Sequence, residues 1–314
     1  SPLPYVQAII TSVNQTKGTF DCKVDDGFPD FEAQHVLAAP QNWSMLKDPE
    51  YPGRNKAGVR PHYPTAEIVR LLDKNFRISV GTNYISDFSV GDIFVKLARY
   101  NGAATIIFRN SSKNSIINVT VYASPAGVFK ADLSSEINIL DCNVKLYEGR
   151  YASSNADCMH HMGAAVGPWI EGCLFEGHSD DTFNLKWRKA LIMTQSSSNE
   201  ITLNTSCEVG ELLWVYNPRD GLLIDTIRVN KVMRENNQTY HLTLAGNLPV
   251  LVTGRTDQRG DMVYFDSQKN ESFVFRNNIV RDHRRYGVLL QSGYGLIENN
   301  RFENSSNSAI TIQN

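Results

Sequence analysis

The densest group of side chains able to do chemistry lies in residues 154–187. This stretch holds three aspartates, Asp157 and the adjacent pair Asp180 and Asp181, together with three histidines. Asp157 and Asp180 are 23 residues apart in the chain. If the chain winds into a parallel β-helix with coils of that length, the two residues lie on neighbouring coils, about 4.8 Å apart. The spacing therefore predicts three carboxylates on one wall.

Carboxylates at such short range repel one another. At least one of them should therefore have a raised pKa and keep its proton near neutral pH. Glycoside hydrolysis uses such a set, because an acid protonates the leaving oxygen while a carboxylate activates water or attacks the sugar. The alternatives are a calcium site, aspartates that cap turns, and solvated turn aspartates.

The histidines and tryptophans nearby admit more than one interpretation. His160 and His161 are adjacent, so in a strand they point to opposite sides and only one can face a site. Three histidines with an aspartate could bind zinc, but their spacing does not resemble HExxH or another two-ligand clip. We therefore predict neither a metal nor an organic cofactor. Trp169 and Trp187 are candidates for stacking on a sugar ring, although tryptophan is also common in protein cores.

The composition excludes several classes of protein. With 31 basic and 33 acidic residues and a formal net charge of -2, the chain lacks the basic surplus that binding to a nucleic-acid backbone requires. Hydrophobic residues make up 41% of the chain, which excludes disorder. No apolar run approaches the roughly 18 residues of a membrane span. We expect a folded protein of one to three domains, with no nucleic-acid partner.

Two further features bear on the compartment. The five cysteines include no CxxC pair, which suits neither a zinc cluster nor a dense disulfide scaffold, so we expect most of them to be buried as small apolar residues. The chain also holds eight N-x-S/T sequons, about twice the number that its Asn, Ser and Thr content predicts by chance. This excess favours a secreted, periplasmic or cell-surface protein whose signal peptide lies outside the chain.

The elements that would position the site are short β-strands. One motif, with polar residues between two apolar ones, recurs along the chain, and two pairs of its copies start 22 residues apart. Asn pairs mark two of its turns. Such a period is typical of a parallel β-helix with laddered Asn side chains; an antiparallel β-sandwich is the alternative. The copies are INVTV (117–121), ILDCNV (139–144), IEGCLF (170–175), FRNNIV (275–280) and IENNRF (297–302).

Two stretches break this repeat. Both show period-two alternation with hairpin signals, at 15–18 and 217–221. We therefore predict an all-β fold, a parallel β-helix with two small antiparallel β-barrel modules. The expected divisions are a barrel-like module with flanking β-helix strands at 1–110, a β-helix with the catalytic coil at 111–188, a barrel insertion at 189–262, and a β-helix at 263–314 that continues beyond the chain.

Three segments carry a resemblance to a known family. ADCMHHMG, WIEGCLFEGHSDDTFNL and RRYGVLLQSGYGLIENNRFENSSNSAI, with a barrel-like insertion before the last, resemble glycoside hydrolase family 110, the exo-acting α-1,3-galactosidases. The resemblance covers most of residues 85–314 and is most specific in the ADxxH and DDxxN elements. It implies a right-handed parallel β-helix, hydrolysis with inversion, and an oligosaccharide or glycoconjugate substrate with terminal α-galactose. It also implies that association into homo-oligomers is common.

The resemblance implies roles for the three aspartates. The family's carboxylates fall on Asp157, Asp180 and Asp181. By similarity to β-helical polygalacturonases, which also pair a DD with an earlier aspartate, we assign Asp181 as the general acid and the other two as the holders of the attacking water. Inversion would place the acid and base carboxyls roughly 6.5–9.5 Å apart.

The same resemblance implies a set of substrate-binding residues. His160 and Asn184 match the motifs as ligands of sugar hydroxyls. His178 adjoins the aspartate pair and is expected to tune it. Arg285 follows by position on the next coil, and Trp187 is the expected stacking residue.

Two other functions remain as alternatives. A polysaccharide lyase on the same fold would need a cationic groove, and the acidic stretch has no Lys or Arg between Arg150 and Lys186, which counts against it. A non-catalytic carbohydrate-binding β-helix protein would keep the fold without the chemistry. The three aspartates favour the hydrolase over this second alternative.

Overall fold

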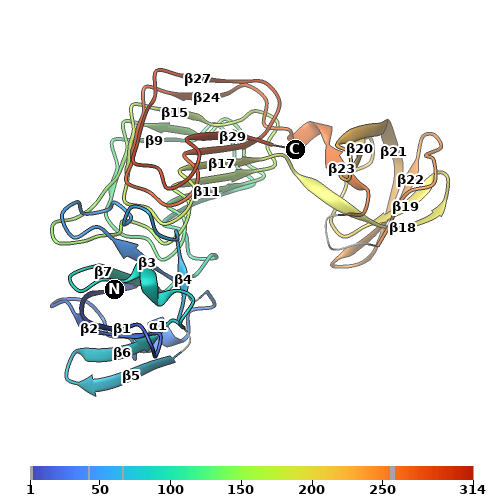
Figure 1. The fold of residues 1–314 in the computed structure, drawn as a ribbon. Coiled ribbons are helices and arrows are strands. Elements are labelled where there is room, and N and C mark those ends of the chain that lie inside the picture. Colours follow the sequence, from blue (N-terminus) through green and yellow to red (C-terminus); the bar gives the residue numbers. More distant parts are fainter. Residues whose placement is uncertain (1–2, 42, 66, 255–258, 314) are drawn as a thin grey trace.

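The computed structural model describes residues 3–41, 43–65, 67–254 and 259–313. In these residues the fold is all-β, as predicted. Three parallel sheets have an antiparallel module at one end and a closed barrel at one side (Figure 1). The helical segments are short: α1 (Gln34–Leu37), η1 (Ile85–Asp87) and η2 (Asp266–Gln268). No helix in the described part of the chain is long and apolar enough to cross a membrane.

The N-terminal module is one antiparallel sheet. Its strands are β1 (Tyr5–Asn14), β2 (Thr19–Val24), β3 (Trp43–Lys47), β4 (Tyr63–Pro64), β5 (Glu67–Leu72), β6 (Asn75–Ser79) and β7 (Ile93–Leu97), in the order β4-β3-β7-β1-β2-β6-β5. β1 and β2 form the hairpin predicted at 15–18. Gly18 is required in that turn, because it has a φ of +64° and a Cβ there would lie 2.5 Å from the Gly81 backbone.

This module differs from the predicted first barrel. Among the described residues the edge strands β4 and β5 do not pair with each other, so the sheet stays open. β5 is mostly exposed along its length, which leaves it no apolar face to close onto another strand. β4 has two residues, and Pro64 has no backbone N–H to donate. Both modules show period-two alternation and a hairpin signal in the sequence, but among the described residues only the second is a closed barrel.

The second module is a closed six-stranded barrel, which confirms that a barrel follows residue 188; its last strand ends at Phe265, beyond the boundary predicted at 262. Its strands are β18 (Lys189–Ser197), β19 (Glu200–Leu203), β20 (Leu212–Asn217), β21 (Leu222–Asn236), β22 (Thr239–Leu244) and β23 (Met262–Phe265), in the order β18-β19-β22-β21-β20-β23. The turn predicted at 217–221 joins β20 to β21. Leu203, Leu213, Val215 and Val263 are fully buried in the barrel's apolar core.

The parallel sheets are built by a repeating circuit of the chain. Each circuit adds one strand to each of three sheets in turn, which is consistent with the predicted β-helix. The six-stranded sheet, here called the site sheet, contains β8 (Ile106–Arg109), β11 (Phe129–Asp132), β14 (Met159–Met162), β17 (Phe183–Lys186), β26 (Val288–Gln291) and β29 (Ile310–Ile312). The barrel is inserted in the circuit that follows β17.

The two other parallel sheets have five strands each. One contains β9 (Ser115–Ile117), β12 (Asn138–Leu140), β15 (Trp169–Glu171), β24 (Phe273–Arg276) and β27 (Gly295–Glu298). The other contains β10 (Thr120–Val121), β13 (Asn143–Val144), β16 (Leu174–Glu176), β25 (Ile279–Arg281) and β28 (Arg301–Glu303). Apolar side chains from all three sheets fill the space between them, including a stack of Phe175, Phe183 and Phe275.

One corner between the sheets is held by a column of polar and thiol side chains. Asn300 Oδ1 accepts the backbone N–H of Asn278 at 2.9 Å, and Asn278 Oδ1 accepts that of Cys173 at 2.9 Å. The column continues with the backbone N–H of Cys142, which lies 3.4 Å from Cys173 Sγ. The predicted Asn ladder is confirmed here, and so is the burial of the cysteines, all five of which are free and buried.

The substitution Asn278→Ala tests the corner column. It would leave the Cys173 N–H and the Ile170 carbonyl without a side-chain partner in the interior. Each such group costs about 1–3 kcal/mol, so we expect the free energy of unfolding to fall by about 2–4 kcal/mol in urea denaturation. Asn138→Ala, which removes an exposed bond to Ser115, should cost less than about 0.5 kcal/mol. Equal losses in the two variants would refute the role given to the column.

Candidate active site

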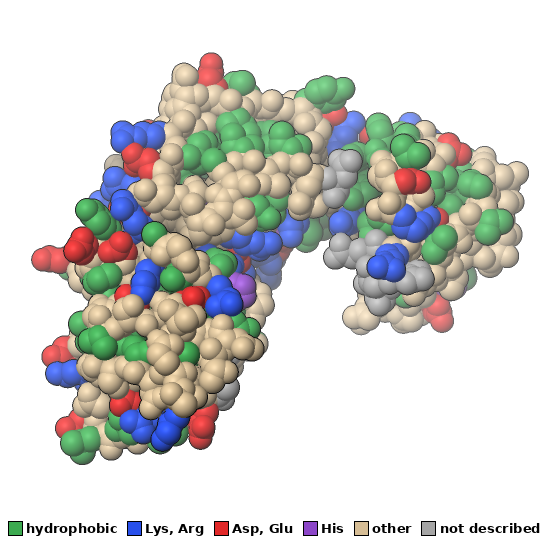
Figure 2. Space-filling model, in the orientation of Figure 1, with side chains coloured by type: hydrophobic (Ala, Val, Ile, Leu, Met, Phe, Trp, Pro, Cys, Tyr) green, Lys and Arg blue, Asp and Glu red, His purple; other side chains and the backbone are tan. Residues whose placement is uncertain are grey.

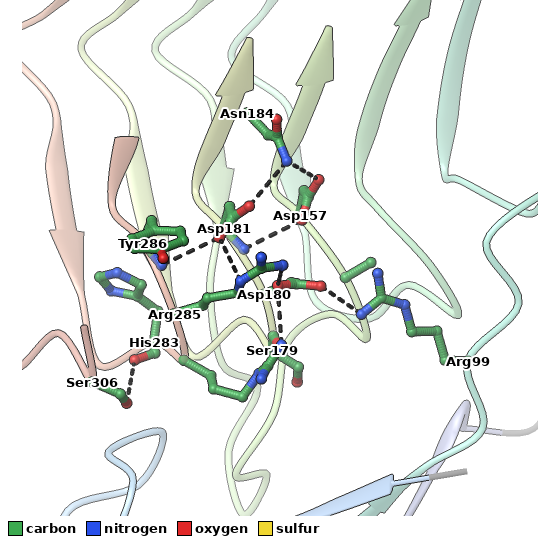
Figure 3. A network of polar contacts seen from close by, with 12 residues as sticks. Arg99, Asp157, Ser179, Asp180, Asp181, Asn184, His283, Arg285, Tyr286 and Ser306 are labelled. Carbon is green, nitrogen blue, oxygen red and sulfur yellow. Dashed lines mark hydrogen bonds and ion pairs between the residues drawn. The ribbon is translucent and has the colours of Figure 1, made fainter. Parts of the chain in front are cut away.

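The acidic residues lie in the turns that enter the site sheet. Asp157 precedes β14 and the Asp180–Asp181 pair precedes β17. These strands are parallel neighbours, with His160 in register with Asn184. The turns therefore stack on each other, and carboxylate oxygens of the three aspartates all lie within 4.8 Å of one another (Figure 3). The structure brings the three together as the 23-residue spacing predicts.

Asp157 is held by donors from both turns and strands. Its Oδ2 lies 2.8 Å from Nδ1 of His160 and 3.3 Å from Nδ2 of Asn184. Its Oδ1 accepts the backbone N–H of Asp181 at 3.2 Å. Nδ2 of Asn184 also donates to Asp181 Oδ2 at 2.9 Å, so one side-chain amide bridges two carboxyls and fixes their separation.

Asp180 is surrounded by arginines. Its Oδ2 lies 2.6 Å from Nη1 of Arg99, and its Oδ1 lies 3.1 Å from Nη1 of Arg285 (Figure 3). The same Oδ1 lies 3.0 Å from Nη2 of Arg284. Burial alone would raise the pKa of Asp180, but the charges of Arg284, Arg99 and Arg285 outweigh burial and lower it. Asp180 is therefore ionised at neutral pH.

Asp181 has the opposite character. Its side chain has no exposed surface. Burial, followed by the charges of Asp157 and Asp180, raises the pKa of Asp181 to about 7, although Arg285 and the backbone N–H of Tyr286 act in the other direction. Two aspartates that are adjacent in the chain thus differ in protonation. The predicted raised pKa is found at Asp181, with burial as the larger cause and repulsion between carboxylates as the second.

A cavity of about 240 Å³ opens over this cluster. Among the aspartates it is Asp157 and Asp180 that line it, while Asp181 lies behind them. Lys and Arg side chains gather where the parallel sheets meet the N-terminal module (Figure 2). The lining residues are Arg99, Asn101, Ala104, Gly127, Lys130, Ala156, Asp157, His160, Asp180, Asn184, Lys186 and Arg285.

The cationic lining corrects one sequence argument. The acidic stretch itself has no Lys or Arg between Arg150 and Lys186, but neighbouring coils and the N-terminal module supply Arg99, Lys130 and Arg285. A segment of one coil does not define a groove built from several coils. The cavity therefore has the cationic residues whose absence from the acidic stretch counted against a lyase.

Of the five expected substrate-binding residues, three line the cavity and two lie elsewhere. His160, Asn184 and Arg285 line it. His178 is buried; its Nε2 lies 2.7 Å from Thr182 Oγ1, and its ring stacks on that of His283. Burial, followed by the charge of His283, lowers the pKa of His178 well below its usual value. Trp187 lines a different cavity, next to the barrel.

Sequence reasoning did not find Arg99 and Arg284. Arg99 follows β7 of the N-terminal module, and its contact with Asp180 spans 81 residues, a distance that no period marks. Arg284 precedes Arg285, and an adjacent arginine pair was the available signal. Both guanidinium groups lie over the ring of Trp43, at 5.7 and 4.3 Å from its centroid, so the N-terminal module positions both cations.

Cations of the chain already occupy one side of the aspartate cluster. One oxygen from each of the three carboxyls is close enough to share an ion. However, three arginines already pair with Asp180. A divalent cation would have to compete with these arginines for the Asp180 oxygens.

The carboxyl spacing is shorter than expected for inversion. One oxygen from each carboxyl lies within 4.8 Å of one from each of the others, whereas inverting enzymes typically separate the acid and base carboxyls by roughly 6.5–9.5 Å. The difference follows from adjacent turns stacking at the spacing of paired strands. Distance alone therefore does not support an inverting mechanism.

Comparison with known proteins gives one distant relative. The chain is 26% identical over 236 residues, 71% of its length, to alpha-1,3-galactosidase B of Akkermansia muciniphila. It spans 29% of the length of that relative. No protein-family model matches the chain. The likeness supports a galactosidase-like relationship, and the assignment to glycoside hydrolase family 110 stays a prediction.

Asp181→Asn tests the protonation of the buried carboxyl. Because its pKa is about 7 in the folded chain and its ordinary value is 3.8, the folded state holds a proton that the unfolded state releases between these values. This contribution to stability is present at low pH and is lost as the pH rises towards 7. The free energy of unfolding of Asp181→Asn, relative to wild type, should therefore increase by up to about 1.4 kcal/mol per pH unit over this window.

Asp180→Asn is the matched control, because the contribution of Asp180 to stability depends on pH in the opposite direction. The pKa of Asp180 is lowered, so its contribution is present above the ordinary carboxyl pKa and is lost in acid. Removing the charge of Asp180 leaves the buried Arg284 without this carboxylate partner. We therefore expect the free energy of unfolding to fall by about 3–5 kcal/mol at pH 7. A difference between Asp181→Asn and wild type that does not change with pH would contradict the account of Asp181.

Proposed function

We propose that this cavity is the active site of an exo-acting glycoside hydrolase that releases terminal α-1,3-linked galactose from glycans. The observation that carries the proposal is the opposite protonation of Asp180 and Asp181, because a pair of carboxyls with separated pKa values supplies an acid and an ionised partner in one site. The distant galactosidase relative supports galactose as the sugar. The circuit of three parallel sheets supports a right-handed β-helix as the scaffold.

The walls of the cavity offer groups suited to sugar hydroxyls. His160 and Asn184 face it from neighbouring strands. Oδ1 of Asn184 is buried and has no hydrogen-bond partner among the described residues, although its amide nitrogen is fully engaged. A buried acceptor without a partner is costly, and a sugar hydroxyl would satisfy it. Lys130 and Lys186 add donors at the rim.

Each aspartate has a part in the proposed reaction. Asp181 holds the proton. Asp157, within 4.8 Å of it on the cavity wall, takes up this proton and passes it to the glycosidic oxygen as the bond to the anomeric carbon breaks, which leaves Asp181 ionised. Water attacks the anomeric carbon and gives a proton to Asp180, which is ionised before this step. Transfer of that proton from Asp180 to Asp181 restores the starting state.

We propose that the reaction proceeds with inversion. A carboxylate nucleophile must be free to approach the anomeric carbon, but Asp180 is held by three arginines and Asp181 is covered. Asp157 is bound by His160, Asn184 and a backbone N–H. Water is therefore the attacking group that the contacts leave free, and attack by water in one step inverts the anomeric centre.

A polysaccharide lyase is the second candidate. Lys130 and Lys186 at the cavity give this function a support that the acidic stretch alone did not. A lyase would act on a uronate and leave an unsaturated sugar, whereas a hydrolase leaves free galactose. Ultraviolet absorbance of the products distinguishes the two activities.

Three amide variants and one control test the proposed hydrolase. With an α-1,3-galactobioside, the wild-type protein should release galactose whose first-formed anomer, followed by NMR, is β. Asp157→Asn, Asp180→Asn and Asp181→Asn should each lower kcat by about 10²–10⁴-fold, the range for loss of a general acid or base. Asp141→Asn, an exposed aspartate at a turn of a neighbouring coil, should leave kcat unchanged. Sugar binding without turnover in wild type would instead indicate a lectin-like protein.

The pH dependence of the rate follows from the same pKa. Hydrolysis needs the proton on Asp181, whose pKa is about 7. We therefore expect kcat/KM to fall about tenfold per pH unit above pH 7, with no such limb between pH 5 and 7. A rate that stays constant up to pH 9 would show that no carboxyl of this pKa supplies the proton.

A further inference from the structure

A second cavity lies between the site sheet and the barrel. It has a volume of about 230 Å³ and contains no carboxylate among its lining residues. Three of its lining residues are aromatic: Trp187, Tyr216 and Tyr264. Trp187 follows β17, and the two tyrosines belong to β20 and β23 of the barrel. In Figure 1 these barrel strands and the ends of β17 and β29 face each other.

The rings are held in fixed positions. Trp187 donates its indole N–H to the Phe265 carbonyl at 2.7 Å, and its ring lies 5.0 Å from that of Tyr264. Tyr264 in turn lies 5.4 Å from Tyr216, and Trp214 packs behind Trp187 at 5.7 Å. Rings that are already fixed lose little conformational entropy when a ligand binds. Tyr264 is buried, whereas Trp187 and Tyr216 are half-buried, so these two rings are the ones that can meet the C–H face of a pyranose and Tyr264 supports them.

The polar groups of the cavity suit a neutral sugar. Gln291 and Gln313 line it, and in the part of the chain that the structure describes their side-chain amides make no hydrogen bond. Each amide offers both donors and an acceptor, the combination that sugar hydroxyls also present. Lys189 adds one further donor at the edge. Fixed aromatic faces with a few convergent polar groups are typical of a small-ligand site.

The second cavity adjoins the acidic one. Lys186, which lines the acidic cavity, is in register with Gln291, which lines the second cavity, on the neighbouring strand of the site sheet. Side chains of paired strands lie about 5 Å apart. The two cavities are therefore close enough for one oligosaccharide to occupy both.

We propose that this aromatic cavity binds the sugars on the leaving-group side of the scissile bond, while the terminal galactose occupies the acidic cavity. The direction in which the oligosaccharide lies across the two cavities rests on the proposed function, whereas sugar binding in the aromatic cavity rests on its rings and side-chain amides. The sugars in the aromatic cavity leave with the protonated oxygen once the bond is broken. The cavity thereby favours substrates in which at least two sugars precede the terminal galactose.

Kinetics with short and long substrates test the inference. Tyr216→Ala and Gln291→Ala, in the full chain, should raise KM for a trisaccharide with terminal α-1,3-linked galactose about tenfold more than KM for nitrophenyl α-galactoside. Tyr147→Ala, an exposed tyrosine outside both cavities, is the matched control and should change neither constant. Gln291→Ala removes no packed ring, so it remains informative if Tyr216→Ala folds poorly. Equal changes in KM for the two substrates would overturn the inference.

A binding measurement separates this inference from the proposed hydrolysis. The probe is the disaccharide that remains after the terminal galactose is removed, titrated against tryptophan fluorescence. Wild type and Tyr147→Ala should show a saturable change, which Tyr216→Ala and Gln291→Ala should lose. Saturable binding in a protein that hydrolyses nothing would refute the hydrolase and leave the sugar site standing. No saturable change in wild type would refute the sugar site, whatever the hydrolysis assay shows.

Discussion

The site depends on an electrostatic difference between two adjacent aspartates. Asp180 is ionised because Arg99, Arg284 and Arg285 surround it, and Asp181 retains a proton because it is buried beside two other carboxyls. Each condition has its own cause. If the arginines were absent, Asp180 would compete for the same proton, and if Asp181 were exposed, solvent would ionise it.

The scaffold creates this difference by stacking. Paired turns ahead of β14 and β17 bring the carboxyls within 4.8 Å, and the corner column and the apolar interior keep the coils in register. Arg284 and Arg285 come from the next coil, after the barrel insertion, while Arg99 comes from the N-terminal module. The active-site charge balance therefore needs three parts of the chain that lie far apart in the sequence.

The sequence predicted the features that follow from local pattern. The 23-residue spacing placed Asp157 beside the pair at 180 and 181, and the alternation after residue 188 predicted the barrel whose strands lie between Lys189 and Phe265. It did not predict Arg99, because contacts between a module and a coil follow no period. The prediction that Trp187 lies in the galactose site was wrong, because Trp187 lines the second cavity. A motif predicts where a residue lies along a strand, but not which cavity its side chain lines. The prediction that the first module is a barrel was wrong. A sheet closes only if its two edge strands pair, and period-two alternation within a strand does not say which strands pair.

The most direct test of the account is the titration of the aspartate carboxyl carbons by NMR, with ¹³C-labelled aspartate in the full chain. The account predicts one carboxyl that titrates near pH 7, is absent from the spectrum of Asp181→Asn, and shifts when Asp157 is replaced by Asn. It also predicts that the Asp180 resonance stays ionised throughout the range from pH 4 to 9. If every aspartate titrated below pH 5, no proton would be stored in the cluster and the proposed division between acid and ionised partner would be wrong.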